Sequence, residues 1–143
     1  MKYPKFWIGV LVAGVVCNAL DFLVQGQLLT KIYYSKLDSM RQDTNPAWFV
    51  LGDFVAILVL AWVLYRVLSV FCSGAKAGAV AGFFLGVIVN FPTFHFIHLM
   101  MRNFPYPLVW IGTLYGIAWY VLAGAILGSF LKKPVPAGAA AAG

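Results

Sequence analysis

Residues 77–91 read Ala-Gly-Ala-Val-Ala-Gly-Phe-Phe-Leu-Gly-Val-Ile-Val-Asn-Phe, in a stretch that holds no Asp, Glu, Lys or Arg between Lys76 and Arg102. This stretch is long enough for a membrane-spanning helix, which needs about 20 apolar residues. Three other apolar runs of similar length occur in the chain. The sequence therefore predicts an all-α protein, a bundle of four transmembrane helices at 6–24, 47–71, 75–101 and 108–131.

The composition agrees with a lipid environment. Of the 143 residues, 63% are hydrophobic and 10% are charged, whereas soluble domains carry about 25% charged residues. Four spans account for most of the chain, so we expect a single domain over residues 1–133. The Ala-, Gly- and Pro-rich tail at 134–143 has few large apolar side chains, and we expect it to be disordered.

The connection between the first two spans carries a helical pattern of its own. Apolar residues recur at helical spacing, and polar residues lie toward the other side. Such an amphipathic segment lies at the membrane surface or caps the bundle. The apolar residues are Leu29, Ile32, Tyr33, Leu37 and Met40, and the polar residues are Lys31, Ser35, Asp38 and Arg41.

The net charge of +6 comes from basic residues that flank the apolar runs and form no dense patch. This distribution argues against nucleic-acid binding. Basic residues near span ends favour the cytoplasmic side, and the larger group predicts that both termini are cytoplasmic. That group is Lys2, Lys5, Arg66, Lys76, Lys132 and Lys133, and the opposite group is Lys31, Lys36, Arg41 and Arg102.

Glycines recur every four residues along the third span and in two pairs along the fourth. Small residues at this spacing let two helix backbones approach closely in lipid. We expect them to pack the third span against the fourth within one chain, and a homodimer through one of these faces is the alternative. The residues are Gly74, Gly78, Gly82, Gly86, Gly112, Gly116, Gly124 and Gly128.

A weak internal repeat relates the two halves of the chain. The segment from Gly14 to Asn18 resembles that from Gly86 to Asn90, and a phenylalanine follows each segment four residues later. A proline and a tryptophan open the next span in both halves. The pattern suggests a duplicated helical hairpin with a pseudo-two-fold axis along the membrane normal.

Polar and ionisable side chains inside the apolar runs form the candidate site. An aspartate at the centre of a spanning helix costs about 3 kcal/mol, so such residues are rare and often functional. Because the spans alternate in direction, these residues are expected at similar depth in the outer half of the membrane. The candidate cluster consists of Asn18, Asp21, Asp53, Asn90, His95, His98 and Tyr115. Trp119 and Tyr120 lie deeper, where they fill the bundle or line a cavity.

Several interpretations of this cluster stay open. The side chains form a polar network near the headgroups, or they bind a small molecule or protons for transport. A single histidine among aromatic residues suits haem or a chlorophyll-type pigment. Imidazole and carboxylate groups also suit a divalent metal such as zinc. The weak metal candidates are His95, His98, Asp21 and Asp53. We predict no resident cofactor.

The sequence holds no nucleophile–base arrangement, phosphate-binding loop or Cys-x-x-Cys pair, so we expect no enzyme. Packing signals outnumber chemical ones. The favoured function is therefore a non-catalytic helix-packing subunit or accessory protein of a membrane complex or homo-oligomer. The alternative is a small transporter, or a ligand- or metal-binding bundle, that uses the polar cluster.

The segments Gly78-Ala-Val-Ala-Gly82, Asn90-Phe-Pro92 and Trp119-Tyr-Val-Leu-Ala-Gly-Ala-Ile-Leu-Gly128 resemble small four-helix bacterial membrane proteins classed as domains of unknown function. Those families share the chain length, a longer first loop and Gly-rich third and fourth spans. The resemblance implies a protein of the bacterial inner membrane, surrounded by the lipid bilayer, and it assigns no activity. The His95/His98 pair and the alanine-rich tail depart from that pattern.

Overall fold

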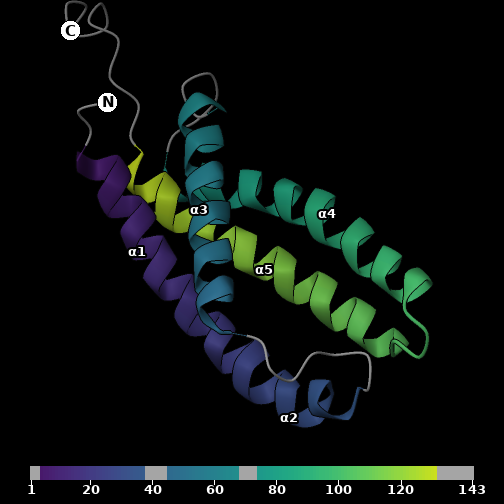
Figure 1. The fold of residues 1–143 in the computed structure, drawn as a ribbon. Coiled ribbons are helices and arrows are strands. Elements are labelled where there is room, and N and C mark those ends of the chain that lie inside the picture. Colours follow the sequence, from purple (N-terminus) through teal and green to yellow (C-terminus); the bar gives the residue numbers. More distant parts are fainter. Residues whose placement is uncertain (1–3, 38–44, 68–73, 132–143) are drawn as a thin grey trace, which may run out of the picture.

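The computed structural model describes residues 4–37, 45–67 and 74–131, and within these ranges the chain forms helices and no strand. The tail at 134–143, the predicted end of the second span at 68–71 and three of the flanking lysines lie outside them. Figure 1 shows the helices in chain order. They are α1 (Pro4–Asp21), the π-helical segment η1 (Phe22–Leu29), α2 (Thr30–Ile32), the 3₁₀ turn η2 (Tyr34–Lys36), α3 (Ala47–Val67), α4 (Ala75–Met100) and α5 (Tyr106–Phe130).

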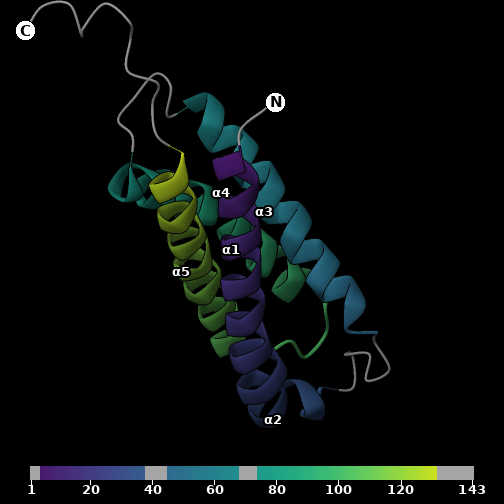
Figure 2. The ribbon, with the colours of Figure 1, turned by 90° about the vertical axis from the view of Figure 1, so that its left-hand side faces the viewer.

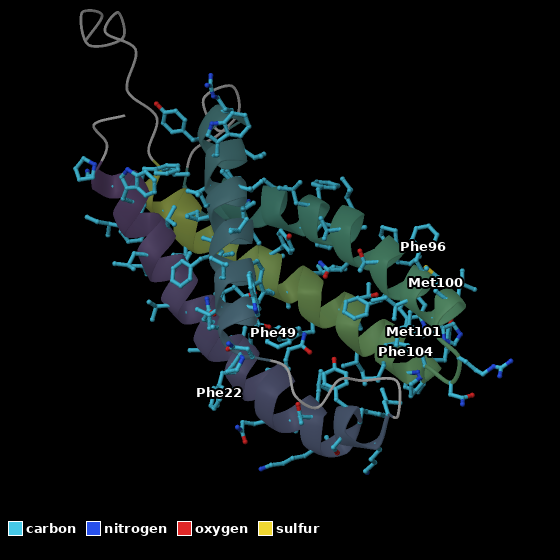
Figure 3. All side chains as sticks on the ribbon, in the orientation of Figure 1. Phe22, Phe49, Phe96, Met100, Met101 and Phe104 are labelled. Atoms are coloured by element: carbon cyan, nitrogen blue, oxygen red, sulfur yellow. The ribbon has the colours of Figure 1, made fainter. Side chains whose placement is uncertain are left out.

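Four helices are long and apolar enough to cross a membrane, which confirms the four predicted apolar helices. Large apolar side chains are exposed along all of them, as expected where a helix faces lipid. Figure 3 shows that Phe22, Phe96 and Met100 point away from the bundle. The four stretches are Pro4–Lys36, Ala47–Arg66, Ala75–Met100 and Tyr106–Phe130.

The four long helices alternate in direction, so that the bundle has two distinct ends (Figure 2). Pro4, Ala75 and Phe130 lie at one end, which we call the termini end. At that end a Cβ atom on Gly9 would come within 3.0 Å of the Phe130 side chain. The opposite end holds Ala47 and the connection between α4 and α5, and we call it the turn end.

The first helix is longer than the sequence indicates. It does not end at Val24, because η1 and α2 continue it almost without interruption. The residues facing the protein along this stretch, Cys17, Asp21, Gln25, Leu29 and Tyr33, are spaced strictly by four. In a regular α-helix, positions 17 and 33 would differ by about 160° in direction. The wider π-helical turns remove this drift and keep one face toward the protein.

The predicted amphipathic segment is therefore an extension of the first helix, and part of its apolar side packs at the turn end, whereas Ile32 is exposed. Tyr33, Tyr34 and Leu37 contact a small cluster formed by the buried side chains of Phe104 and Leu108. Lys31 and Ser35 on the other side are exposed. The part of the pattern that includes Asp38, Met40 and Arg41 lies outside the described residues.

Glycines join α4 to α5 in the closest helix pair of the structure. A Cβ atom on Gly78 would overlap the carbonyl group of Gly124, and a Cβ atom on Gly124 would overlap the carbonyl group of Gly78. Gly82 meets the backbone of Tyr120 in the same way. Because no side chain separates the backbones here, α4 and α5 pack more extensively than any other pair.

The other helices pack around α5 less evenly. Both α1 and α3 contact α5 and each other, whereas α3 and α4 barely touch. The main core lies between α1, α3 and α5, toward the termini end. Its buried residues are Phe6, Val10, Ala13, Cys17, Ile57, Leu60, Ala61, Leu64, Trp119, Ala123, Leu127 and Leu131.

Local features match between the two halves, although the packing differs. The Asn18 side chain donates to the Gly14 carbonyl (2.9 Å), and the Asn90 side chain donates to the Gly86 carbonyl (2.9 Å). In a symmetric duplication, α3 would pack against α4 as α1 packs against α5. The structure lacks this equivalence, because α3 and α4 barely touch. The duplicated hairpin therefore stays a prediction.

Candidate functional site

A cavity of about 180 Å³ lies where the four long helices meet, on the turn-end side of the main core. For scale, an engineered cavity of about 150 Å³ in another protein holds a benzene molecule. Every one of the four candidate spans contributes to its wall. The lining residues are Asp21, Gln25, Asp53, Ala56, Val89, Asn90, Phe94, Gly112, Tyr115, Gly116, Trp119 and Tyr120.

Asp21 is held by two hydrogen bonds from α5. The Tyr115 hydroxyl donates to Oδ1 (2.8 Å), and the Trp119 indole Nε1 donates to Oδ2 (2.6 Å). Tyr115 and Trp119 are four residues apart, so both reach the cavity from one face of α5. Both oxygens of a carboxyl group inside the bundle are thus occupied, which fixes the orientation of the group.

Asp53 brings a second carboxyl group to the same place from α3. It approaches Asp21 closely enough to hydrogen-bond with it. No lysine, arginine or histidine is among the described residues that line the cavity. Among the described residues, the cavity therefore has an acidic side without a basic neighbour in its lining.

The α4 side of the cavity is shaped by residues that fit against glycines of α5. The amide group of Asn90 occupies the space beside Gly116, and the ring of Phe94 occupies the space beside Gly112. A Cβ atom at either glycine would overlap these side chains. Gly112 and Gly116 thus position the cavity wall, in addition to the helix packing expected of them.

Gln25 lines the cavity at the turn end, within the π-helical segment. Its side-chain Oε1 accepts a hydrogen bond from the Tyr34 hydroxyl (2.9 Å), and its backbone carbonyl accepts one from Thr30 Oγ1 (2.8 Å). Both partners lie in the extension of the first helix. Through these bonds the extension is connected directly to the cavity rim.

The structure brings together four of the seven residues in the predicted cluster: Asp21, Asp53, Asn90 and Tyr115 all line the cavity. Asn18 lies on the same face of α1 as Asp21, but its side chain bonds to its own helix.

The two histidines lie outside the cavity, on the turn-end part of α4. His95 Nδ1 donates to the Phe91 carbonyl (2.6 Å), and its ring stacks on Phe91 with centroids 4.2 Å apart. The ring also meets Trp110 edge-on at 5.5 Å. His98 Nδ1 donates to the Phe104 carbonyl (2.9 Å) and so fastens the α4–α5 connection. Neither histidine is among the residues that line the cavity.

The metal candidates do not form one site. Asp21 and Asp53 are adjacent, but the histidines are not beside them. In the ranges 4–37, 45–67 and 74–131, no three His, Cys, Asp or Glu side chains converge as metal ligands do.

Among the lining residues that the predicted cluster omits, three carry a polar group: Gln25, Trp119 and Tyr120. Gln25 follows Asp21 by four residues, and Trp119 follows Tyr115 by four residues. Continuing each polar face by one helical turn identifies both.

No protein-family model, curated protein or solved structure matches this chain. The fold and the cavity therefore define its class by themselves: a helical protein with four potential membrane spans and an acidic, aromatic-lined cavity between them. The resemblance to small four-helix bacterial membrane proteins stays a prediction.

Proposed function

We propose that this chain is an integral protein of the bacterial inner membrane that binds a small ligand in the cavity between its four spans. One observation carries the proposal. All four spans contribute to one cavity, and polar side chains from each of them line it. Ligand sites in proteins are concave, mostly apolar, and carry a few converging polar groups.

The depth of the cavity supports a functional role. At about 1.5 Å per residue, Asp53 lies about 9 Å along α3 from Ala47, and Asn90 lies about 15 Å along α4 from Met100. The hydrocarbon core of a bilayer is about 30 Å thick. The cavity then lies within the membrane, between its middle and the surface at the turn end. Ionisable groups at that depth are costly and mark ligand or ion pathways.

The regularly spaced glycines of α4 and α5 give little support to the function that the sequence favours, a subunit that docks on helices of a partner. Those of α4 are in contact with α5, and Gly112 and Gly116 are covered by side chains of α4. The glycine spacing of α4 and α5 is therefore already used for packing within one chain. We accordingly favour ligand binding, as part of transport or sensing, over the accessory-subunit role and over catalysis.

The test measures binding by the full chain in lipid nanodiscs, using isothermal titration calorimetry. The probes are benzylammonium, benzyl alcohol and benzoate, which share one ring and differ in charge. We expect saturable binding of at least one probe at up to millimolar concentration. Ala56→Leu, which fills the cavity from α3, should weaken that binding at least about tenfold, equivalent to 1.4 kcal/mol.

The matched control is Ala118→Leu, which adds the same group on the exposed side of α5 and should leave binding unchanged. Absence of saturable binding for all three probes would overturn the proposal. So would equal binding by the Ala56→Leu protein and the unmodified protein.

A further inference from the structure

We infer that the ligand is a small, singly charged organic cation, and that the two aspartates have different roles toward it. Asp21 carries the negative charge that the cation meets, and Asp53 is a positioning residue that keeps its own proton and donates a hydrogen bond to Asp21. This inference rests on the proposed function, because it assumes that the cavity is a ligand site.

The hydrogen bonds around Asp21 assign the roles. The indole N–H of Trp119 can only donate, so Asp21 Oδ2 must accept. Oδ1 accepts the Tyr115 hydroxyl. An ionised carboxylate has no donor of its own, so two carboxyl groups hydrogen-bond to each other only when one holds a proton. Both oxygens of Asp21 already accept a hydrogen bond, and a protonated carboxyl oxygen is a poorer acceptor than an ionised one. We therefore assign the proton to Asp53.

Within the part of the chain that the structure describes, the groups that face this pair add no compensating charge. From α1 the neighbouring ionisable group is the Cys17 thiol, and from α5 the neighbours are the hydroxyls of Tyr115 and Tyr120. On the α4 side the polar lining residue is the neutral amide of Asn90. With one shared proton, the two carboxyl groups carry a single negative charge. A monovalent cation neutralises that charge without displacing the proton.

The rest of the cavity fits an organic cation better than a metal ion. Aromatic rings of Phe94, Tyr115, Trp119 and Tyr120 make up much of its wall. Such rings pack against an apolar body, and their faces attract an ammonium group. Metal sites usually gather three or more His, Cys, Asp or Glu ligands, whereas the described lining holds two carboxyl groups, one of them protonated.

The test extends the calorimetric titration of benzylammonium, benzyl alcohol and benzoate to variants of the two aspartates. On the unmodified protein we expect benzylammonium to bind at least about tenfold more tightly than benzyl alcohol, and benzoate not to bind. Asp21→Asn should remove this preference and leave benzyl alcohol binding in place. Retained benzyl alcohol binding shows that the variant is folded with an intact cavity.

Two substitutions at Asp53 test its separate role. Asp53→Leu removes the donor to Asp21 and should weaken benzylammonium binding several-fold. Asp53→Asn offers an amide N–H in the place of the proton, so it should restore much of that affinity and lose far less than Asp21→Asn.

The outcomes separate this inference from the proposed function. If benzyl alcohol or benzoate binds the unmodified protein as tightly as benzylammonium, the cavity is a ligand site but the cation assignment is wrong. If Asp53→Asn loses as much affinity as Asp21→Asn, the assignment of roles is wrong. If none of the three probes binds, the proposed function itself fails.

Discussion

The Tyr115 hydroxyl donates a hydrogen bond of 2.8 Å to Asp21 Oδ1, although 94 positions in the sequence separate the two residues. The Trp119 indole bonds to the other oxygen of the same carboxyl group. Together they fix the first span on the last one at two points, at the level of the cavity. The same contact that orders the acidic group also closes the bundle.

Replacing Tyr115 with Phe removes one donor to Asp21 and keeps the ring. We expect Tyr115→Phe to lower the free energy of unfolding by about 1 kcal/mol, the usual scale for one such bond in a membrane protein. Sodium dodecyl sulfate titration in mixed micelles measures it. Tyr120→Phe is the control, since its hydroxyl makes no hydrogen bond to the described part of the chain. Equal losses in both variants would contradict the Asp21 contact.

A methyl group at Gly78 should separate α4 from α5. Because its Cβ atom would overlap the Gly124 carbonyl, we expect Gly78→Ala to cost about 2 kcal/mol in the same unfolding assay. A Cβ atom on Gly52 of α3 would meet no neighbouring atom within 4 Å, and alanine is the better helix former. Gly52→Ala should therefore be neutral or stabilising by up to about 1 kcal/mol. A neutral Gly78→Ala variant would show that the two backbones lie further apart.

The adjacency of the two carboxyl groups can be tested by cross-linking. In a background with Cys17→Ala and Cys72→Ala, the pair Asp21→Cys and Asp53→Cys should form a disulfide readily under mild oxidation. Non-reducing electrophoresis of a proteolytically nicked sample detects the bond. The comparison pair is Asp21→Cys with Gly52→Cys, because Gly52 faces outward beside Asp53. A folded protein in which both pairs react alike would exclude the observed arrangement.

The histidines should not affect ligand binding. Because His95 and His98 bond to backbone carbonyls outside the cavity, the double variant His95→Gln, His98→Gln should keep benzylammonium affinity within about threefold, less than 1 kcal/mol. Chelation with EDTA should leave it unchanged too. A large loss of benzylammonium affinity in the double variant would show that the histidines take part in binding. A large loss after EDTA would show that a metal does.

Orientation can be tested with reporters fused after Gly143. The basic residues predict a cytoplasmic C-terminus, so a green fluorescent protein fusion should fluoresce and an alkaline phosphatase fusion should be inactive. The reverse pattern would place the cavity in the cytoplasmic half of the membrane.

Hydropathy was sufficient to predict the four helices, because apolar runs of this length have few other uses. It misplaced the end of the first helix. Gln25, Gln27 and Thr30 resemble a loop in composition, yet i to i+5 hydrogen bonding continues the helix through them. A search for the α-helical period of 3.6 residues does not detect a helix face whose residues recur every four positions.

Depth along the helices, which follows from the sequence, was enough to bring Asp21, Asp53 and Tyr115 together. His95 and His98 lie farther along α4 toward the turn end, about 7.5 and 12 Å from Asn90, and His95 also differs in its direction around the helix. At 100° per residue, His95 lies about 140° around α4 from Asn90. Asn90 faces α5, so His95 cannot reach the same cavity. The sequence predicts that the two carboxyl groups share one cluster, whereas the hydrogen bonds of Asp21 to Tyr115 and Trp119 depend on how α1 rests on α5.

The π-helical segment η1 has a consequence for tolerance to insertions and deletions. A π-helical turn holds more residues than an α-helical turn, so loss of one residue within 22–29 can be absorbed by a change to α-helical turns. The first helix would shorten slightly, with Asp21 still in place. The α5 segment between Gly112 and Trp119 is already α-helical and cannot absorb a deletion in this way. Loss of one residue there would rotate Tyr115 or Trp119 away from Asp21. Among related sequences, insertions and deletions should therefore occur in the segment just after Asp21 and be absent from the α5 segment that faces Asp21.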